Sequence, residues 1–215
     1  MRVGIALAVV GGAALVVELL MRGDREGDPP VAPAEPSPSG FPVPIAVGRT
    51  DDPDVAPLLE EMGTLFEREG IDLGVITPAE VTMMPSVGQV AIPPRSYWPR
   101  MALTLREVFM PLRKAMGVPL VIRGGYRAPD YNAAVGGEPK SRHQAFEALD
   151  IRVASGHSSA DRRKELAQQA AKIYRSRGSE LKMGFGVYGF PVPGNIHVDT
   201  GWKRRTWNDA KRFLA

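Results

Sequence analysis

Three side chains of the types that bind catalytic zinc stand in two segments that lie far apart in this chain. His143 and Asp150 belong to the first segment, and His197 follows Asp150 by 47 residues. Two imidazoles and one carboxylate form a ligand set that catalytic zinc uses, with a fourth position left for water. The chain has only three histidines, so few other combinations exist. The sequence therefore predicts a fold that brings both segments together around one metal ion.

The spacing between His143 and Asp150 limits the local structure. A straight strand would separate their Cα atoms by roughly 23 Å, which side chains cannot bridge at zinc distances. A straight helix would separate them by about 10 Å, at the limit of reach. We therefore expect a loop that carries His143 and returns into a strand that carries Asp150, with His197 on a neighbouring strand.

The segment His197-Val198-Asp199 adds a second acidic residue to this group. In a strand, the period of two puts the side chains of His197 and Asp199 on the same face. Asp199 is therefore expected near any metal that His197 binds, where it either fixes a ligand or moves a proton.

Composition narrows the chemistry further. The chain has no cysteine, which excludes thiolate metal sites, cysteine nucleophiles and disulfides. Its 27 lysines and arginines against 24 acidic residues give a net charge of only +3, which does not favour a nucleic-acid partner. A length of 215 residues supports one ordinary domain with appendages, and we expect a monomer.

The first 22 residues predict a transmembrane anchor or a signal segment. Residues 3–21 are apolar apart from Glu18, and in a helix they would span about 28 Å, enough for the bilayer core. Arg2 supplies the positive flank that stays cytoplasmic. The bulky residues 16–20 offer no small-residue cleavage site, which favours an uncleaved anchor over a signal peptide. We therefore expect a single-pass protein of the cytoplasmic membrane, with its C-terminal domain in the periplasm or outside the cell.

Residues 23–50 are predicted to be a proline-rich linker, because repeated proline favours an extended conformation without a core of its own. Ordered structure is expected to begin near Asp51, and residues 51–96 to form a helical and irregular extension. Within it, residues 57–69 have helical spacing, whereas residues 74–94 contain four prolines and are expected to be irregular.

Residues 97–215 are expected to form the main domain. Helices are predicted over 98–116 and from a cap at 158–161 to Gly178. Strands are predicted at 118–123, 148–153, 182–188 and 195–200. A turn and a terminal helix are expected over 202–214. Helices and short strands without regular alternation indicate an α+β fold, in which helices flank a small antiparallel sheet.

Several motifs of this domain form a combination that resembles a known family. They are Gly125-Tyr126-Arg127-Ala128-Pro129, Asn132, Ser141-x-His143, Ala148-x-Asp150 and His197-Val198-Asp199-Thr200-Gly201. Over about residues 97–207 the chain resembles the zinc D-alanyl-D-alanine carboxypeptidase family of metallopeptidases, which implies the Hedgehog-like α+β fold of that family.

The resemblance implies a site and an activity. It implies that Zn²⁺ is bound by His143, Asp150 and His197. It further implies a role in substrate binding for three residues, namely Arg127, Tyr126 and Ser141. Arg127 would also orient the substrate for catalysis, through a charge-assisted bond to a carboxylate or a peptide carbonyl. Enzymes of this kind are hydrolases that cut peptidoglycan stem peptides containing D-amino acids, as D,D-carboxypeptidases or endopeptidases.

Two positions depart from the family pattern. Phe146 stands where many members have glycine, and we expect it to narrow the pocket or to alter the loop. Gly194 stands three residues before the last histidine, where the best-known members carry an acidic general base. Asp199 is the nearest replacement in sequence. Glu147 is a less favoured candidate, because strand alternation could turn it away from Asp150.

Three hypotheses follow. The first is a membrane-anchored zinc metallopeptidase that hydrolyses peptidoglycan peptides in the cell envelope. The second is a catalytically inactive zinc-containing module for peptidoglycan binding or envelope assembly, in which Gly194 reflects lost activity. The third is an anchored interaction domain without metal, whose polar residues are structural. Metal analysis separates the third hypothesis from the others, and an assay on wall peptides separates the first two.

Overall fold

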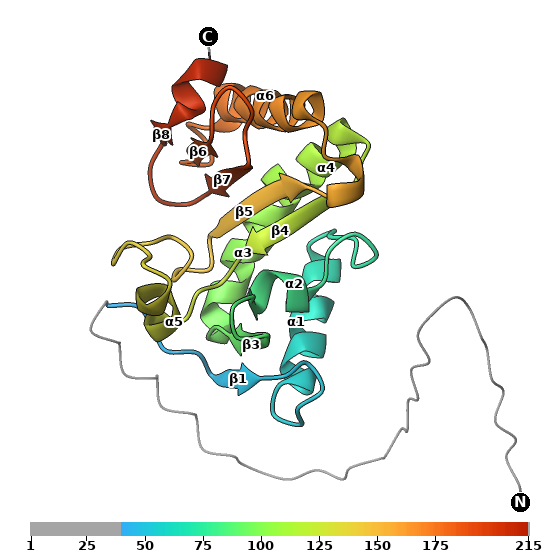
Figure 1. Ribbon diagram of the computed structural model, residues 1–215. Coiled ribbons are helices and arrows are strands. Elements are labelled where there is room, and N and C mark those ends of the chain that lie inside the picture. Colours follow the sequence, from blue (N-terminus) through green and yellow to red (C-terminus); the bar gives the residue numbers. More distant parts are fainter. Residues whose placement is uncertain (1–39, 215) are drawn as a thin grey trace, which may run out of the picture. The chain divides into compact units, whose positions relative to one another are not determined.

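A five-stranded sheet carries Asp150, His197 and Asp199 in the computed structural model, which describes residues 40–214 (Figure 1). Its strands, in sheet order, are β4 (Leu120–Gly124), β5 (Ala148–Val153), β7 (Asn195–Asp199), β6 (Gly184–Tyr188) and β8 (Arg205–Asn208). The first four strands pair antiparallel, whereas β8 runs parallel to β6. The four strands predicted from the sequence are confirmed, with ends that differ by at most two residues.

Side-chain alternation gives this sheet two different faces. The residues of β5, β6 and β7 that are buried on the apolar face are Leu149, Ile151, Val153, Phe185, Val187, Ile196 and Val198. Asp150 and His197 alternate with these residues and therefore point to the opposite face. The pattern of the strands alone thus places the two predicted ligands on one side of the sheet.

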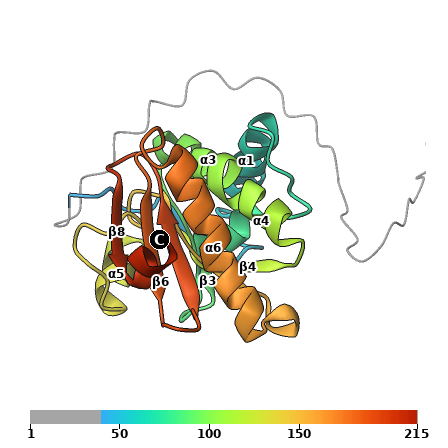
Figure 2. The same ribbon diagram turned by 90° about the horizontal axis from the view of Figure 1, so that it is seen from above.

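Helices cover the apolar face. They are α3 (Trp98–Thr104), α4 (Met110–Met116) and α6 (Ala160–Arg177), and α6 lies across β5, β6 and β7 (Figure 2). The side chain of Ser159 accepts a hydrogen bond from the Arg162 amide and caps α6, as the sequence predicted. The predicted helix over 98–116 also forms, with a π-helical turn (Leu105–Phe109) that ends two residues before Pro111, whose missing N–H interrupts regular hydrogen bonding. Both helix predictions are therefore confirmed.

The segment before α3 shares the core of the main sheet and forms a second, three-stranded sheet. Its elements are β1 (Ala46–Gly48), α1 (Ala56–Arg68), α2 (Pro78–Thr82), β2 (Met83–Met84) and β3 (Gln89–Ile92), with strand order β1-β3-β2. The helix predicted over 57–69 is confirmed as α1. The expectation that order begins near Asp51 is wrong, because β1 pairs with β3 within the range assigned to the linker.

The prediction that residues 74–94 are irregular is also wrong, since they contain α2, β2 and β3. The prolines stand at the boundaries of these elements and leave their interiors regular. Pro78 occupies the first turn of α2, where no backbone donor is needed, and Thr77 forms a capping box with Glu80. Pro93 directly follows β3. Proline content therefore marked the ends of short elements in this segment.

The C-terminal segment differs from its prediction as well. Residues 202–214 were expected to form a turn and a helix, but they form β8 and a short 3₁₀ segment (Asp209–Phe213). The strand forms because Trp207 packs over Gly186 of β6, where a Cβ atom would lie 2.5 Å from the indole ring. This contact joins residues distant in sequence, so no local pattern revealed it.

The predicted membrane segment and most of the predicted linker lie outside the described residues. Between Gly40 and Leu214, no helix has both the length and the apolar character needed to cross a membrane.

Candidate metal centre and active site

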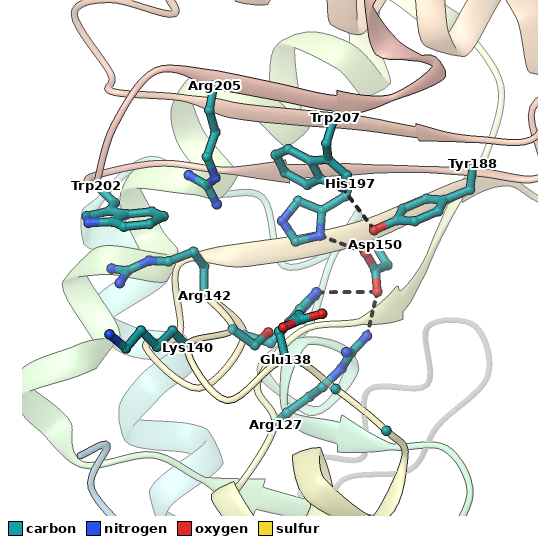
Figure 3. Close-up of a pocket in the computed structure, with 14 residues that line it drawn as sticks. Arg127, Glu138, Lys140, Arg142, Asp150, Tyr188, His197, Trp202, Arg205 and Trp207 are labelled. Carbon is teal, nitrogen blue, oxygen red and sulfur yellow. Dashed lines mark hydrogen bonds and ion pairs between the residues drawn. The ribbon is translucent and has the colours of Figure 1, made fainter. Parts of the chain in front are cut away.

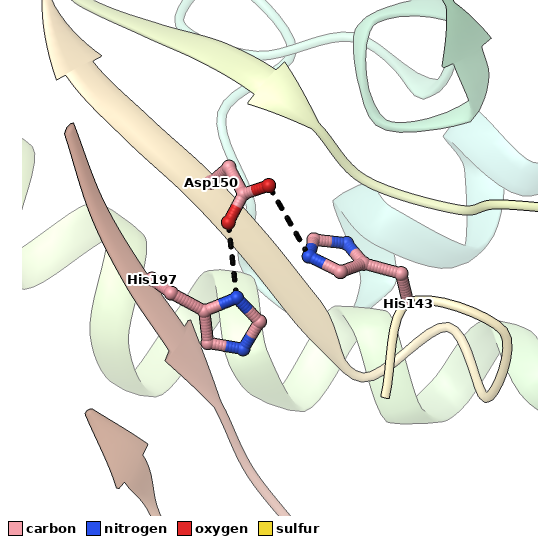
Figure 4. Close-up of side chains that lie close together, drawn as sticks. All are labelled: His143, Asp150 and His197. Atoms are coloured by element: carbon pink, nitrogen blue, oxygen red, sulfur yellow. Dashed lines mark hydrogen bonds and ion pairs between the residues drawn. The ribbon is translucent and has the colours of Figure 1, made fainter. Parts of the chain in front are cut away.

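One row of residues crosses the whole sheet and organises the site. Gly124 lies opposite Asp150, Asp150 opposite His197, His197 opposite Gly186, and Gly186 beside Trp207. A shift of register in β4 between Ile122 and Gly124 brings the start of this row into line. The side chains of Asp150 and His197 therefore lie next to each other on adjacent antiparallel strands (Figure 4).

His143 reaches the row from the loop between α5 (Pro129–Ala134) and β5, which confirms the predicted return of a loop into a strand. Its Nδ1 lies 2.7 Å from the Gly125 carbonyl oxygen, and its Nε2 lies 3.3 Å from Asp150 Oδ2. Because a carbonyl oxygen only accepts, Nδ1 carries the proton in the neutral ring and Nε2 presents a lone pair.

The turn that supplies the Gly125 carbonyl is held by α2. Tyr126 N donates to Val81 O at 2.7 Å, and a Cβ atom on Gly125 would lie only 2.0 Å from that same oxygen. Glycine is therefore required at position 125 for the backbone of α2 to approach this closely. Contact with α2 therefore holds the turn in place, and the Gly125 carbonyl group of this turn fixes the orientation of His143.

His197 is held on both sides by carboxylates. Its Nδ1 lies 2.9 Å from Asp150 Oδ1, and its Nε2 lies 3.1 Å from Asp199 Oδ2. Asp199 is fully buried and accepts two hydrogen bonds from Arg205, at 3.0 and 2.7 Å. A Cβ atom on Gly184 would lie 2.2 Å from Asp199 Oδ2, so this glycine leaves room for the carboxylate.

These contacts decide between the two roles expected for Asp199. The carboxylate lies on the side of His197 away from Asp150, is bound to Arg205, and does not line the pocket described below. The prediction that Asp199 moves the catalytic proton is therefore corrected. Asp199 instead fixes the ring of His197, as carboxylates do behind metal-binding histidines.

The donor atoms fit one metal ion. One ligand atom each from His143, Asp150 and His197 lies within 4.8 Å of the other two. Ligands around a tetrahedral zinc ion lie roughly 3.4 Å from each other, so small side-chain movements suffice. Each imidazole also has one nitrogen bound to an oxygen outside the ligand set, while its other nitrogen faces the Asp150 carboxylate, where a metal would lie between them. The predicted ligand set therefore comes together in space.

The pKa values of these groups are shifted in different directions. Burial lowers the pKa of His143, and the charge of Asp150 opposes this only in part. Burial also acts to lower the pKa of His197, but its hydrogen bonds to Asp150 and Asp199 outweigh burial and raise that pKa. Burial acts to raise the pKa of Asp150, yet its interactions with both histidines hold the pKa well below its usual range. In the metal-free protein, these shifts favour the protonated form of His197 and the neutral form of His143, and a metal ion would take the place of the His197 proton.

The three side chains open into a pocket of about 460 Å³ (Figure 3). Arg127 and Ser141 line it, as the resemblance implied. Arg127 Nη2 donates to Asp150 Oδ2 at 2.6 Å. Gly124 allows this approach, because a Cβ atom there would lie 3.2 Å from Arg127 Nη2 and 3.0 Å from Asp150 Oδ2.

Two aromatic residues lie in the core and not at the pocket: Tyr126, expected to bind substrate, and Phe146, expected to narrow the pocket or alter the loop. Both side chains are fully buried, and their rings pack edge to face with centroids 5.8 Å apart. The Tyr126 hydroxyl donates to Pro42 O, away from the metal-binding side chains. Phe146 has a φ of 55°, which glycine adopts more readily, so the backbone keeps a glycine-like conformation while the ring fills the core. Phe146 therefore does not narrow the pocket, and Tyr126 supports the core.

Glu147, the less favoured candidate for the base, points away from the pocket. It is buried and forms ion pairs with Arg100 at 3.1 Å and with Arg142. This agrees with the alternation argument made from the sequence.

Other pocket residues were not selected from the sequence. They are Glu138, Lys140, Arg142, Tyr188, Trp202, Arg205 and Trp207. Arg205 and Trp207 were missed because their segment was expected to be helical. Glu138 stands only five residues before His143, in the loop that returns to β5, so this short spacing could have identified it as a pocket residue from the sequence.

Comparison with protein families agrees with the geometry. A model of the family described as Peptidase M15 matches residues 75–190, just over half of the chain. The match begins in the segment that contains α2, and it includes Arg127, His143 and Asp150. His197 lies beyond the matched range, and the sheet register adds it to the site. A search of curated protein sequences found no match. With the family matched over this length and the three candidate ligands brought together, the chain belongs to the peptidase M15 family.

Proposed function

We propose that this chain is a zinc peptidase that hydrolyses peptidoglycan peptides containing D-amino acids. The observation that carries the proposal is the convergence of His143 Nε2, the Asp150 carboxylate and His197 Nδ1 at the pocket. Membership of a peptidase family supports hydrolysis of a peptide bond. Two nitrogens and a carboxylate, with both imidazoles oriented from behind, support zinc as the metal.

When bound by His143, Asp150 and His197, zinc would polarise the scissile carbonyl and make water more acidic. The chain's own residues do the remaining work. Asp199 and the Gly125 carbonyl hold the two imidazoles in orientation. This arrangement fixes the reacting groups before the substrate arrives, which lowers the reorganisation that the reaction requires.

Arg127 is proposed to bind and orient the peptide. Only its Nη2 group binds Asp150, and the rest of the guanidinium has no side-chain partner among residues 40–214. Its side chain is 23 % exposed, so the free N–H groups can donate to a substrate carbonyl or carboxylate. Ser141, half-buried at the pocket wall, offers a hydroxyl group to the same substrate.

The charge of the pocket supports an anionic peptide as the substrate. Lys140, Arg142 and Arg205 line its outer part beside Trp202, whereas Glu138 and Asp150 are the acids that line it within the described chain. Stem peptides carry carboxylate groups, which such cations attract. We further propose that the protein acts in the cell envelope as a monomer. Residues 1–22 would anchor it in the cytoplasmic membrane and the linker would hold the domain outside the cytoplasm.

The test uses purified full-length protein in detergent, its metal content and a set of defined wall peptides. We expect about one zinc ion per chain and cleavage of peptides that contain D-amino acids. The variant His143→Ala should lose both zinc and cleavage. The matched control is His157→Ala, because His157 is exposed and lies outside the pocket, and it should retain both.

Two outcomes would contradict the proposal. Bound zinc without cleavage of any wall peptide would favour the wall-binding module, for which the glycine at position 194 is the supporting observation. Absence of zinc after gentle purification, with no zinc uptake on titration, would exclude both the peptidase and the zinc-containing module.

A further inference from the structure

Hydrolysis of a peptide bond needs a group that accepts a proton from the attacking water and passes it to the leaving amine. Position 194 is glycine, so the acid of the best-known family members is missing there. Both replacements considered from the sequence are occupied, since Asp199 is bound by Arg205 and Glu147 by Arg100 and Arg142. Neither of these carboxylates lines the pocket.

Glu138 is an acid that does line the pocket and whose carboxylate is unoccupied. It is exposed, and its carboxylate has no hydrogen bond or ion pair with any residue between 40 and 214. Figure 3 shows its carboxylate group on the same side of the pocket as Arg127 and Asp150, away from the end that Trp202 forms. Within the described chain, Asp150 is the other acid of this pocket, and it is already paired with Arg127 and both histidines.

The backbone that carries Glu138 is anchored, although the side chain is exposed. Its carbonyl oxygen accepts hydrogen bonds from Asn132 Nδ2 at 3.0 Å and from Ser141 N at 2.9 Å. Asn132 is only 2 % exposed, and Gly137 packs so closely on it that a Cβ atom would lie 2.2 Å from Asn132 Oδ1. The loop therefore holds the Glu138 backbone in one place, as a catalytic group requires.

We propose that Glu138 is the general base and acid of this site. The proposal rests on the proposed peptidase function and adds a residue that the family pattern does not supply at this position. The water oxygen bonds to the carbonyl carbon while one water proton passes to the Glu138 carboxylate. The carbon–nitrogen bond then breaks, and Glu138 returns that proton to the leaving nitrogen. One product keeps the hydroxyl group as a new carboxyl group, and the other is the free amine.

The experiment compares Glu138→Gln, Glu138→Asp and the control Asp130→Asn in the zinc-loaded full-length protein. Asp130 is exposed on α5, eight residues before Glu138, so the control removes the same charge from nearby without touching the pocket. We expect Glu138→Gln to lower kcat by about 10²–10⁴-fold, which is the usual range for a positioned acid or base. KM and zinc affinity should change less than about 3-fold, and the acid limb of the pH–kcat profile should disappear. Glu138→Asp should retain part of the activity and the acid limb, whereas Asp130→Asn should behave like the wild type.

A second measurement does not depend on turnover. Calorimetric binding of a phosphinate peptide, which mimics the tetrahedral transition state, is measured in two buffers of different ionisation enthalpy. Wild type should take up about one proton on binding, because Glu138 is protonated beside the phosphinate. Glu138→Gln should take up none, while Asp130→Asn should match the wild type.

The outcomes separate this assignment from the proposed function. Suppose that wild type cleaves wall peptides. If the kcat of Glu138→Gln then stays within about 3-fold of the wild-type value, or if the substitution changes only KM or zinc affinity, Glu138 is not the base. Unchanged proton uptake in Glu138→Gln leads to the same conclusion. Failure of the zinc-loaded wild type to cleave any wall peptide would overturn the peptidase function and the assignment together.

Discussion

The two ends of the pocket are built in contrasting ways (Figure 3). At the metal-binding end, His143 and His197 are almost fully buried, and both nitrogens of each ring face an oxygen atom. At the other end, Trp202 is 44 % exposed, and the side chain of Lys140 has no partner among residues 40–214. The cations nearest the Trp202 ring are Lys203 at 4.4 Å, Arg205 at 4.6 Å and Arg142 at 5.5 Å.

This difference indicates that the two ends of the pocket have different roles. At the metal-binding end, buried hydrogen bonds hold the two imidazole rings in one geometry. Breaking one of these bonds would leave a buried polar atom without a partner. At the outer end, Lys140 and Lys203 are exposed to water and salt, so each contributes little alone. Arg142 and Arg205 are partly buried there and are paired with Glu147 and Asp199. The inner end is therefore suited to the reaction, and the outer end to recruiting an anionic substrate.

The largest effect should come from Asp150→Ala. Asp150 lies between Gly124 and His197 in the row and contacts His143, His197 and Arg127 at once. Its loss removes a ligand, so zinc affinity should fall by more than about 100-fold, beyond what loss of an outer partner causes. Competition with a zinc-binding dye and peptide hydrolysis measure the effect, with Asp130→Ala as the control. Wild-type zinc affinity in Asp150→Ala would exclude this residue as a ligand.

A smaller effect is expected for Asp199→Asn. Asparagine keeps the shape but loses the charge that binds His197 and Arg205, so zinc affinity should fall about 10–100-fold. At saturating zinc, most of the activity should return. If zinc binding were normal while kcat collapsed, the assignment of Asp199 as the residue that fixes His197 would be wrong, and proton transfer would be its role.

The pH dependence of the metal-free protein should show opposite signs for the two histidines. The pKa of His143 is lowered, so the unfolded state binds more protons just below its usual pKa of about 6.5, and stability rises with pH there. The pKa of His197 is raised, so its contribution is complete below about 6.5 and is lost as pH rises through the folded-state value.

Together, these shifts predict a maximum of stability near pH 6.5 in the metal-free protein. Urea unfolding of metal-free protein between about pH 5 and 8.5 measures it. His197→Gln should flatten the limb above the maximum, and His143→Gln the limb below it. A curve that rises steadily through this whole range would contradict the pKa direction at His197.

The smallest effect belongs to the outer end. Lys140→Ala should raise KM for an anionic peptide by about 2–5-fold with kcat unchanged, as expected for one exposed charge worth 0.2–1 kcal/mol. The effect should shrink at high salt, and Lys172→Ala, an exposed charge on α6, is the control. A change in kcat as large as that of Asp150→Ala would remove the distinction between the two ends.

The sequence by itself determined the ligand types and most of the regular elements. Two histidines and one aspartate could be selected because so few metal-binding residues exist in the chain. The helix α6 and the strands β5 and β7 could be recognised because capping and side-chain alternation are properties of neighbouring residues. The alternation in His197-Val198-Asp199 also placed both polar groups on one face.

Only the tertiary structure decided what these residues contact. The register of β5, β7, β6 and β8 sets Asp150 beside His197 and places Trp207 over Gly186. The same register, with Arg205, assigns Asp199 to the back of His197, and the anchored loop brings Glu138 to the pocket. The strand pairings among them join residues that are far apart in the chain. These strand pairings are stabilised by packing and hydrogen bonds that form only as the chain folds, so no local pattern could predict them.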